Sequence, residues 1–430
     1  MVQSSSNNKT SAFILTLLVP FFGLIYTLNH WRESWAKNTF WLACIYFGAV
    51  LVYWPEGTIL GAGSDGGRIV MRLMDWYHSS ISLNDIFSGY LVDQDKMDLF
   101  QPLMIYFISR FTDNGHFLFA VYAFIFGYFY SRNIWYILEK LPNKKFGYLT
   151  ILVILFFLIN PITNINGGRY NTSIHIFVYA LFPYLFENNK KKLWLLLVVP
   201  FVHFSFLYVS IFALVYVFLV PHRVKTTGQS FLVISLVIYI ISFFINSLNL
   251  SSVNAVLEAY SPESFEERIN QYVNQETATY YVDAVVSRNW YVGASGIMKN
   301  WTYGILMVLL FPCIRRNYNR GSQIYDLYIF TLLFSAFANV MALVPAGGRF
   351  LMVSQFIQVG LVLFVSMSIP KKDAFMQYLK IALVVLIIPV IVDIRRLFDY
   401  FSITAVIGNY ITVLFWENNI PIITFIKMIF

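Results

Sequence analysis

The sequence predicts an all-α, polytopic integral membrane protein with about 11–14 membrane helices, because apolar runs of helix-spanning length recur along the chain. Of the 430 residues, 58% are hydrophobic and 12% are charged, whereas a soluble domain carries about 25% charged residues. The apolar runs are long and unbroken, which argues against the alternating strands of a membrane β-barrel. We therefore interpret 1–430 as a single polytopic membrane domain.

The apolar runs predict the membrane spans in order. The first run has one lysine before it and no small-residue cleavage pattern, so we interpret it as a retained span and not as a removed signal peptide. The predicted spans are 11–29, 39–55, 114–138, 146–161, 170–187, 193–220, 229–247, 296–312, 322–344, 350–369 and 376–393.

The run 193–220 differs from the others because both of its flanks are basic. It is 28 residues long, with three lysines at 190–192 before it and Arg223 and Lys225 after it. Two basic flanks on one membrane face require an even number of crossings. The run therefore predicts a short helical hairpin that turns near 200–203, with each arm shorter than the ~20 residues of a full crossing.

The distribution of basic residues predicts the orientation. Six short loops hold 15 lysines and arginines, whereas the loops 162–169 and 344–349 hold one arginine each. The positive-inside rule places the six basic loops in the cytoplasm, which explains the net charge of +8 without nucleic-acid binding. The N-terminus and the long loops 56–113 and 248–295 are then outside. The basic loops are 30–38, 139–145, 187–192, 221–228, 313–321 and 370–373.

The two long outer loops are acidic and aromatic, and we expect them to be partly helical. Residues 261–291 contain enough helix formers to lie as a helix over the membrane surface. The sequence leaves open whether 99–112 is a further short membrane segment. It also leaves open whether 401–416, which Gly408 and Asn409 interrupt, crosses the membrane.

A Gly-Gly-Arg unit occurs three times, at 66–68, 167–169 and 347–349. Glycine pairs allow a tight turn and the close approach of a ligand. An arginine beside them offers a permanent charge and a planar fork of donors suited to phosphate. The second and third units open apolar runs, and the first is predicted to lie in a polar loop. All three are predicted to face outside, which points to a polyanionic head group at the membrane surface.

Arg169 and Arg349 are accordingly the candidate ligands of a substrate diphosphate, with Arg68 as a third. The alternative is that such arginines only reach toward lipid head groups, and the preceding glycine pairs favour the functional interpretation. Asn171 and His175 are candidate supporting groups, because they lie near one face of the helix that Arg169 opens. Their alternative role is hydrogen bonding between helices.

His203 and Asp65 are the candidate catalytic residues. His203 lies at the predicted hairpin tip, and the unperturbed histidine pKa near neutrality suits proton transfer, although a lone histidine among aromatic residues is more often structural. Asp65 could deprotonate a sugar hydroxyl, although spacing alone favours a turn-forming aspartate. The sequence contains no phosphate loop, zinc-protease motif or nucleophile elbow, and we expect no metal and no cofactor.

At these positions the sequence resembles the EpsG family of bacterial polysaccharide proteins, which is related to the Wzy-type O-antigen and capsule polymerases. Two departures concern the first outer loop: Gly66 stands where the family usually has tyrosine, and Gln101 precedes Pro102 where the family often has glutamate. The points of resemblance are Gly63-Ser64-Asp65, the segment from Pro102 to Phe111, Arg169, the lysines at 190–192 with His203, and Arg349.

The resemblance implies a polymerase at the outer face of the bacterial inner (cytoplasmic) membrane. Such an enzyme joins oligosaccharide repeat units carried on undecaprenyl diphosphate by glycosyl transfer. The resemblance also implies a fold similar to membrane-embedded lipid-linked glycosyltransferases. The expected partners are the lipid-linked oligosaccharide and the bilayer, with no nucleic acid, and a chain-length regulator is left open as an additional partner.

Two other functions are compatible with this sequence. A transporter or flippase of a lipid-linked or anionic solute would suit the many spans, but it should show inverted repeats and polar residues near mid-membrane. The sequence shows no such repeat, and its candidate residues cluster at one face. An O-antigen ligase of the same pathway would use similar residues and is distinguished by its product, a single attachment instead of a ladder.

Overall fold

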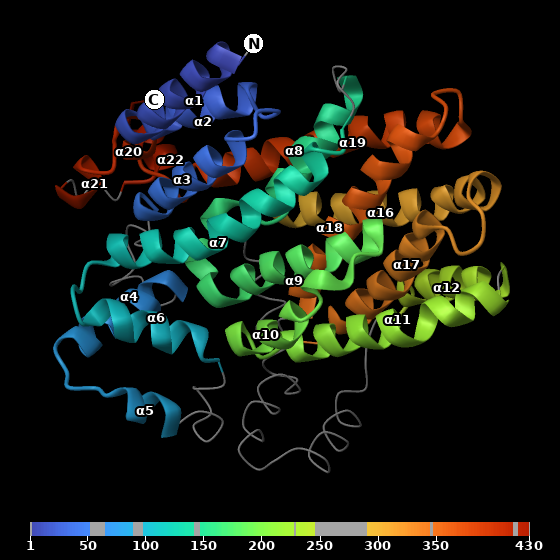
Figure 1. Ribbon diagram of the computed structural model, residues 1–430, viewed down its shortest axis with the longest axis horizontal. Coiled ribbons are helices and arrows are strands. Elements are labelled where there is room, and N and C mark those ends of the chain that lie inside the picture. Colours follow the sequence, from blue (N-terminus) through green and yellow to red (C-terminus); the bar gives the residue numbers. More distant parts are fainter. Residues whose placement is uncertain are drawn as a thin grey trace.

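The computed structural model describes residues 2–51, 65–88, 98–141, 147–227, 229–245, 290–344, 347–415 and 420–429. In these residues the regular elements are helices, joined by turns and two isolated bridges (Figure 1). The prediction of an all-α protein is confirmed. The predicted surface helix over 261–291 lies outside the described residues, except that its last two residues belong to α16.

The amino-terminal elements pack around the long helix α7. Glycines allow α3 and α7 to approach closely, because a Cβ atom at Gly48 would lie 2.3 Å from Ala123 Cβ, and one at Gly127 would lie 2.6 Å from Cys44 Cβ. The elements are α1 (Val2–Leu18), α2 (Pro20–Asn29), α3 (Ala36–Ala49), α4 (Asp65–Tyr77), α5 (Leu83–Ser88), α6 (Phe100–Ser109) and α7 (Gly115–Leu138).

The prediction of a single first span over 11–29 is wrong, because the helix breaks at Val19. Val19 has φ −143° and ψ 79°, and Pro20 follows it. Proline lacks a backbone N–H and disfavours the helical conformation of the residue before it. A Cβ atom at Gly23 would lie 2.3 Å from Thr16 Oγ1, so the two halves pack tightly against each other. The predicted outside location of the N-terminus rested on one crossing here and stays untested.

Helix α9 lies at the centre of the molecule, with apolar residues buried around its whole circumference. It contacts α7, α10, α11, α17 and α18, as expected for a helix that is hydrophobic on every side. The central elements are η2 (Gly147–Leu149), α8 (Thr150–Leu158), η3 (Ile162–Gly167), α9 (Gly168–Glu187), η4 (Lys190–Lys192), α10 (Leu195–Val202), α11 (Phe206–Thr227) and α12 (Gln229–Ser242).

The hairpin predicted within 193–220 is present, and its turn at 203–205 begins at the last residue of the predicted 200–203. The prediction that both arms are shorter than a full crossing is wrong. Only α10, with 8 residues, is short. Helix α11 has 22 residues and is about 33 Å long, which is enough for a full crossing.

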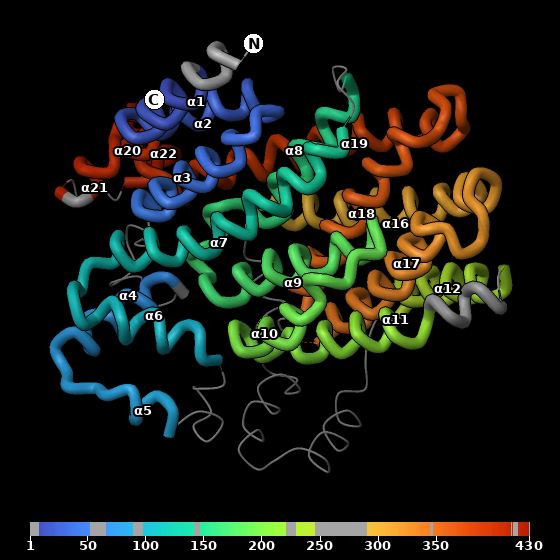
Figure 2. The backbone as a smooth tube through the Cα atoms, viewed as in Figure 1, coloured from blue at the N-terminus to red at the C-terminus, as the bar shows by residue number. Residues whose placement is uncertain are grey.

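The carboxy-terminal elements return to the amino-terminal helices, and α1 and α22 lie at the same corner of the molecule (Figure 2). The run 401–416 does not form one helix, because it is divided at Gly408 and Asn409 into α20 and α21, each of four residues. The elements are α16 (Trp290–Asn317), α17 (Gln323–Met341), η6 (Gly347–Arg349), α18 (Phe350–Ser368), α19 (Ala374–Leu397), α20 (Thr404–Ile407), α21 (Thr412–Phe415) and α22 (Ile422–Ile429).

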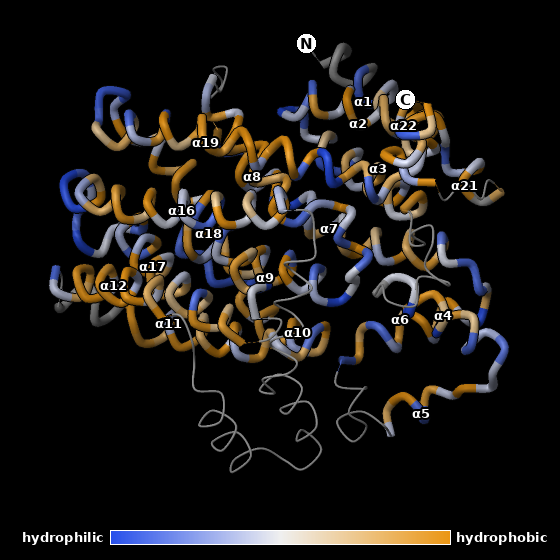
Figure 3. Tube along the Cα trace, turned by 180° about the vertical axis from the view of Figure 1, so that it is seen from behind, coloured by the Kyte–Doolittle hydropathy of each residue, from blue (hydrophilic) through white to orange (hydrophobic). Residues whose placement is uncertain are grey.

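The protein is a multi-pass membrane protein by the length and composition of its helices. In the described residues, 5 helical stretches are long and apolar enough to cross a membrane. Helices α11, α12 and α19 are rich in hydrophobic residues (Figure 3), and many of these side chains are exposed, as expected for surfaces that face lipid. The predicted total of about 11–14 membrane helices stays a prediction. The 5 stretches are Gly147–Glu187, Trp290–Asn317, Gln323–Met341, Gly347–Ser368 and Ala374–Leu397.

The two ends of α9 meet different parts of the chain. Near its end, the Gln323 side chain at the start of α17 donates hydrogen bonds to the carbonyls of Tyr184 and Leu185, at 2.9 and 2.7 Å. At its beginning, Arg349 of η6 lies over the ring of Tyr170. Figure 1 shows the same two ends: the connections that follow α11, α16 and α18 lie at the right, and α4, α6 and α10 lie toward the left. Two predicted basic loops and two Gly-Gly-Arg units thus lie at opposite ends of the bundle.

Candidate active site

The candidate site lies where the first turn of α9 meets the tip of the α10–α11 hairpin. The chain turns sharply from η3 into α9 at Gly168, whose φ of 25° lies in the left-handed region that favours glycine. This turn places Arg169 in the first helical turn of α9. The prediction that this arginine opens a helix is therefore confirmed.

A buried carboxylate, Asp98, joins α9 to the hairpin tip. Its side chain is 1% exposed and directly precedes the turn into α6. The Oδ2 atom accepts a hydrogen bond from Arg169 Nη1 at 2.7 Å and lies 3.2 Å from His203 Nδ1. The Oδ1 atom accepts a hydrogen bond from the backbone N–H of Phe204 at 2.6 Å. One carboxylate thus holds two of the predicted site residues together.

Backbone hydrogen bonds hold the same junction in place. Helix α10 ends at Val202, and the N–H of His203 still donates to the carbonyl of Val199 at 3.0 Å. The N–H of Leu99 donates to the carbonyl of Phe201 at 3.0 Å. The segment 98–99 is therefore tied to the tip through both its backbone and the Asp98 side chain.

The charges in the site favour a neutral imidazole beside an ionised carboxylate. Burial lowers the pKa of His203, and the charges of Arg169 and Arg349 lower it further, while the bond to Asp98 opposes them. Burial alone would raise the pKa of Asp98. The hydrogen bonds from His203 and the Phe204 N–H, together with the charge of Arg169, outweigh this effect of burial, so the pKa of Asp98 is lowered. The neutral ring therefore donates from Nδ1 to Asp98 and keeps its lone pair on Nε2.

Arg349 reaches the site from the other half of the chain. Its guanidinium carbon lies 5.3 Å from the centre of the Tyr170 ring. The Tyr170 ring in turn lies 5.3 Å from the His203 ring, edge to face. Arginines from α9 and η6, which were predicted to act together, are therefore both gathered around His203.

Four buried polar atoms near Arg169 have no hydrogen-bond partner in the described part of the chain. Such atoms are costly unless a ligand or water satisfies them. They come from α7, from η3 and from the first turns of α9, so buried polar groups that lack a partner surround Arg169. The atoms are Tyr122 Oη, Asn166 Oδ1, Tyr170 Oη and Asn171 Oδ1.

The first Gly-Gly-Arg unit lies in the first turn of α4. The prediction that it lies in a loop is therefore wrong. A Cβ atom at Gly66 would lie 1.7 Å from Asn166 Oδ1, so α4 packs directly against η3. The Arg68 side chain is exposed. Asp65 is the first residue of α4, but its side chain is outside the described part, so its predicted catalytic role is not tested.

The two predicted supporting residues have structural contacts. Asn171 donates from Nδ2 to the carbonyl of Asn164 at 2.8 Å and so holds η3 against α9. His175 is fully buried, with Nε2 3.0 Å from the carbonyl of Asn160 and Nδ1 3.3 Å from Asn133 Nδ2. His175 therefore links α9 to α7 and to the residues that follow α8, which is the alternative role considered above.

Replacing His175 with leucine should destabilise the protein without a specific loss of activity. The substitution leaves the buried carbonyl of Asn160 without its partner, at a cost of about 1–3 kcal/mol, whereas Asn133 Nδ2 keeps its hydrogen bond to the backbone carbonyl of residue 175. Thermal unfolding of the purified protein should show a lower midpoint than wild type. The exposed His78→Leu is the matched control. A loss of activity per folded molecule, at an unchanged midpoint, would contradict the structural role.

Sequence reasoning did not single out Asp98. It belongs to the predicted outer loop 56–113 together with several other acidic residues. One local signal could have distinguished it, because it directly precedes the apolar run 99–112. A carboxylate at such a junction can be buried at low cost only if cations or N–H donors meet it there.

Comparison with family models matches residues 74–403 to the EpsG family. The chain belongs to the EpsG family. This is a family of Wzy-type polymerase-like membrane proteins. The matched part of this EpsG protein includes Asp98 and His203 and begins after Asp65 and Arg68. No curated protein and no solved structure matches the chain.

Proposed function

We propose that this EpsG protein polymerises oligosaccharide repeat units linked to undecaprenyl diphosphate, at the outer face of the bacterial inner membrane. The observation that carries the proposal is the Asp98–His203 pair with Arg169 and Arg349 around it. This cluster combines a base with groups that bind phosphate, and glycosyl transfer from a lipid diphosphate needs both. Family membership supports the same reaction class.

In the proposed reaction His203 is the general base. The hydroxyl oxygen of the incoming repeat unit forms a bond to the anomeric carbon of the growing chain, and its proton passes to His203 Nε2. Asp98 is a positioning residue, because it holds the imidazole by Nδ1 and stabilises the imidazolium that forms. Asp65 is the alternative base.

The two arginines stabilise the leaving group. The bond between the anomeric carbon and the diphosphate oxygen breaks, and the electron pair leaves with the lipid diphosphate. Asp98 engages only Nη1 of Arg169, and 33% of that side chain remains exposed, so further guanidinium donors are available to a phosphate. Arg349 adds a second positive charge, and Arg68 is a third candidate ligand. The lipid diphosphate is itself the activated donor, so we expect no nucleotide.

The proposal is tested by supplying purified wild-type protein in lipid nanodiscs with lipid-linked repeat units. A polymerase converts them into a ladder of multiples of the repeat, which gel electrophoresis and mass spectrometry resolve. The His203→Ala variant should form the ladder about 100-fold more slowly, or more slowly still. A flippase would only move the units between leaflets in vesicles, and a ligase would make one attachment to a lipid acceptor. Either result from wild-type protein, without a ladder, would refute the polymerase.

The pH dependence of elongation should reflect the lowered pKa of His203. A base is active in its deprotonated form, so the rate should hold down to the ordinary histidine pKa near 6.5 and fall only below it. Asp98, whose pKa is also lowered, stays ionised over that range. Arg349→Gln removes one charge that lowers the pKa of His203, so the acid limb should move to higher pH. An acid limb above 6.5 in wild type would contradict this assignment.

A further inference from the structure

A second polar site lies at the opposite end of α7 and α9 from Asp98. It is a cavity of about 350 Å³, within the size range of small-molecule pockets of about 300–1,000 Å³. Its α9 residues lie 10–14 positions beyond Arg169, or about 15–20 Å along the helix axis. The lining residues are Lys37, Tyr128, Arg132, Asn133, Trp135, Tyr136, Glu139, Tyr179, Phe182, Pro183 and Lys192.

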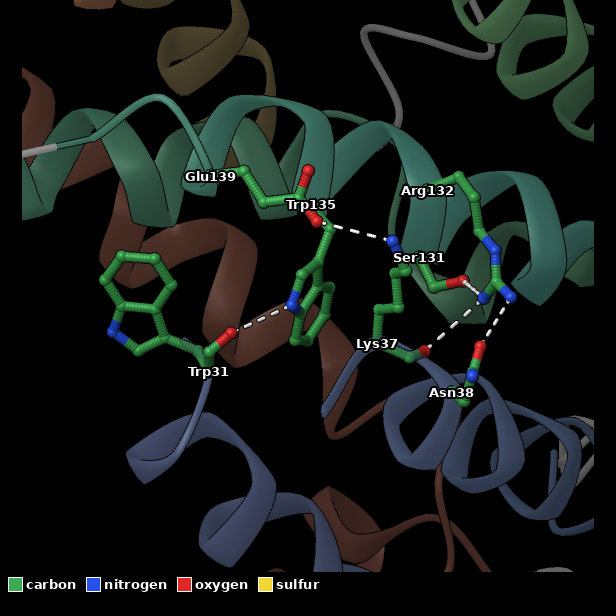
Figure 4. Close-up of polar contacts among 7 residues, drawn as sticks. All are labelled: Trp31, Lys37, Asn38, Ser131, Arg132, Trp135 and Glu139. Atoms are coloured by element: carbon green, nitrogen blue, oxygen red, sulfur yellow. Dashed lines mark hydrogen bonds and ion pairs between the residues drawn. The ribbon is translucent and has the colours of Figure 1, made fainter. Parts of the chain in front are cut away.

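Arg132 is held rigidly in this cavity, but by neutral groups (Figure 4). Its Nη2 donates to Asn38 Oδ1 at 2.6 Å, and its Nη1 donates to Ser131 Oγ at 2.8 Å and to the carbonyl of Lys37 at 3.5 Å. The guanidinium carbon also lies 4.4 Å from the centre of the Tyr128 ring. In the described part of the chain no carboxylate lies within ion-pair distance of it, so its charge remains available to a ligand.

Lys192 carries a second such charge. Its Nζ lies 3.5 Å from the centre of the Tyr179 ring. Burial lowers the pKa of Lys192. Tyr128 and the charge of Glu187 oppose this effect in part, and the charge of Lys37 lowers the pKa further. Each of the nearby acids already has a lysine partner, because Lys37 pairs with Glu139 at 3.3 Å within the cavity lining and Lys140 pairs with Glu187. An anion in the cavity would relieve the repulsion between these cations.

The cavity wall is preorganised. The indole N–H of Trp135 donates to the carbonyl of Trp31 at 2.9 Å (Figure 4), which ties α7 to the turn between α2 and α3. Three cations and one carboxylate line the space, so it has an excess of two positive charges. The aromatic rings of Tyr128 and Tyr179 lie against the guanidinium of Arg132 and the ammonium of Lys192 and hold these charges in place.

We infer that this cavity binds a phosphate group through Arg132 and Lys192. The planar fork of arginine and the ammonium of lysine are the usual protein ligands of phosphate. The group can come from an anionic lipid head group or from a soluble phosphate, since both present the same oxygens. This site is independent of the proposed polymerase chemistry, and its test does not measure elongation.

The first test measures binding to the full-length protein in two arms. Inorganic phosphate is titrated into protein in phosphatidylcholine nanodiscs by calorimetry, and lipids retained from phosphatidylglycerol mixtures are counted by native mass spectrometry. At least one arm should show binding by wild type. Arg132→Gln with Lys192→Gln should weaken it about tenfold or more, whereas the exposed Lys191→Gln should remain within twofold.

A second test uses only wild-type protein, in case the variants do not fold. An amine-selective acylating reagent should label Lys192, and phosphate or phosphatidylglycerol should reduce that labelling severalfold while the labelling of Lys191 stays constant. Protection by phosphate alone assigns a soluble ligand, and protection by phosphatidylglycerol alone assigns a lipid head group. No binding in either arm, or equal labelling of Lys192 with and without both probes, overturns the inference.

Discussion

Asp98→Asn should reduce polymer elongation by about 100-fold or more, the scale of a lost acid–base contribution. Asparagine preserves the shape of the side chain but removes its charge. It can no longer stabilise the His203 imidazolium, and its amide can donate to Nδ1, which would favour the tautomer that carries its proton on Nε2. The base would then lack its lone pair at the reacting position.

The measurement is the initial rate of ladder formation by the purified variant, normalised to folded protein. The exposed Asp75→Asn, in α4, is the matched control and should retain the wild-type rate. The double variant Asp98→Asn with His203→Ala should be no slower than His203→Ala alone, because both residues act as one unit. Additive losses would mean that Asp98 does not act through His203.

Arg349→Ala should lower elongation by about 100-fold or more, the effect of removing one donor that stabilises transition-state charge. Arg349→Lys should retain part of the rate, because it keeps the charge but loses the planar fork. Arg349 is the cleaner test of the two arginines. Arg169→Ala also removes the cation that pairs with Asp98, and it therefore disturbs the base as well as phosphate binding.

Both variants should be compared in cells by the length distribution of surface polysaccharide. Arg110→Ala serves as the control, because Arg110 is an exposed arginine that follows α6 and contacts the Trp76 carbonyl. We expect long-chain polymer with Arg110→Ala, and only single repeat units with Arg169→Ala or Arg349→Ala. Normal long-chain polymer in both of the latter would refute the role of the two arginines.

Much of the helical layout could be predicted from local patterns. The runs 114–138, 170–187 and 350–369 each coincide with one helix to within about two residues, since burial of a long apolar helix depends mainly on its own composition. The basic residues on both flanks of the run 193–220 also predicted the hairpin there. The errors arose at 11–29, where Pro20 breaks the run, and at Gly66, which lies in a helix and not in a loop.

The site was predictable only in part. Arg169 and Arg349 were recognisable because each opens an apolar run, and His203 because it lies at the tip of the predicted hairpin. Asp98 was not, since it is 105 residues from His203 along the chain and resembles the other acids of its loop. The sequence could not show which of these acids is buried against a cation.

The sequence by itself determined that this protein is helical, spans a membrane and carries its basic loops apart from its Gly-Gly-Arg units. These properties follow from the composition and length of the apolar runs and from the positions of the basic residues, all of which are local features of the sequence. Only the tertiary structure decided that Asp98 joins Arg169 to His203, and that Arg132 and Lys192 line a separate cavity. A buried charge is stable only beside its partners, and those partners come from helices distant in the sequence, so packing alone selects them.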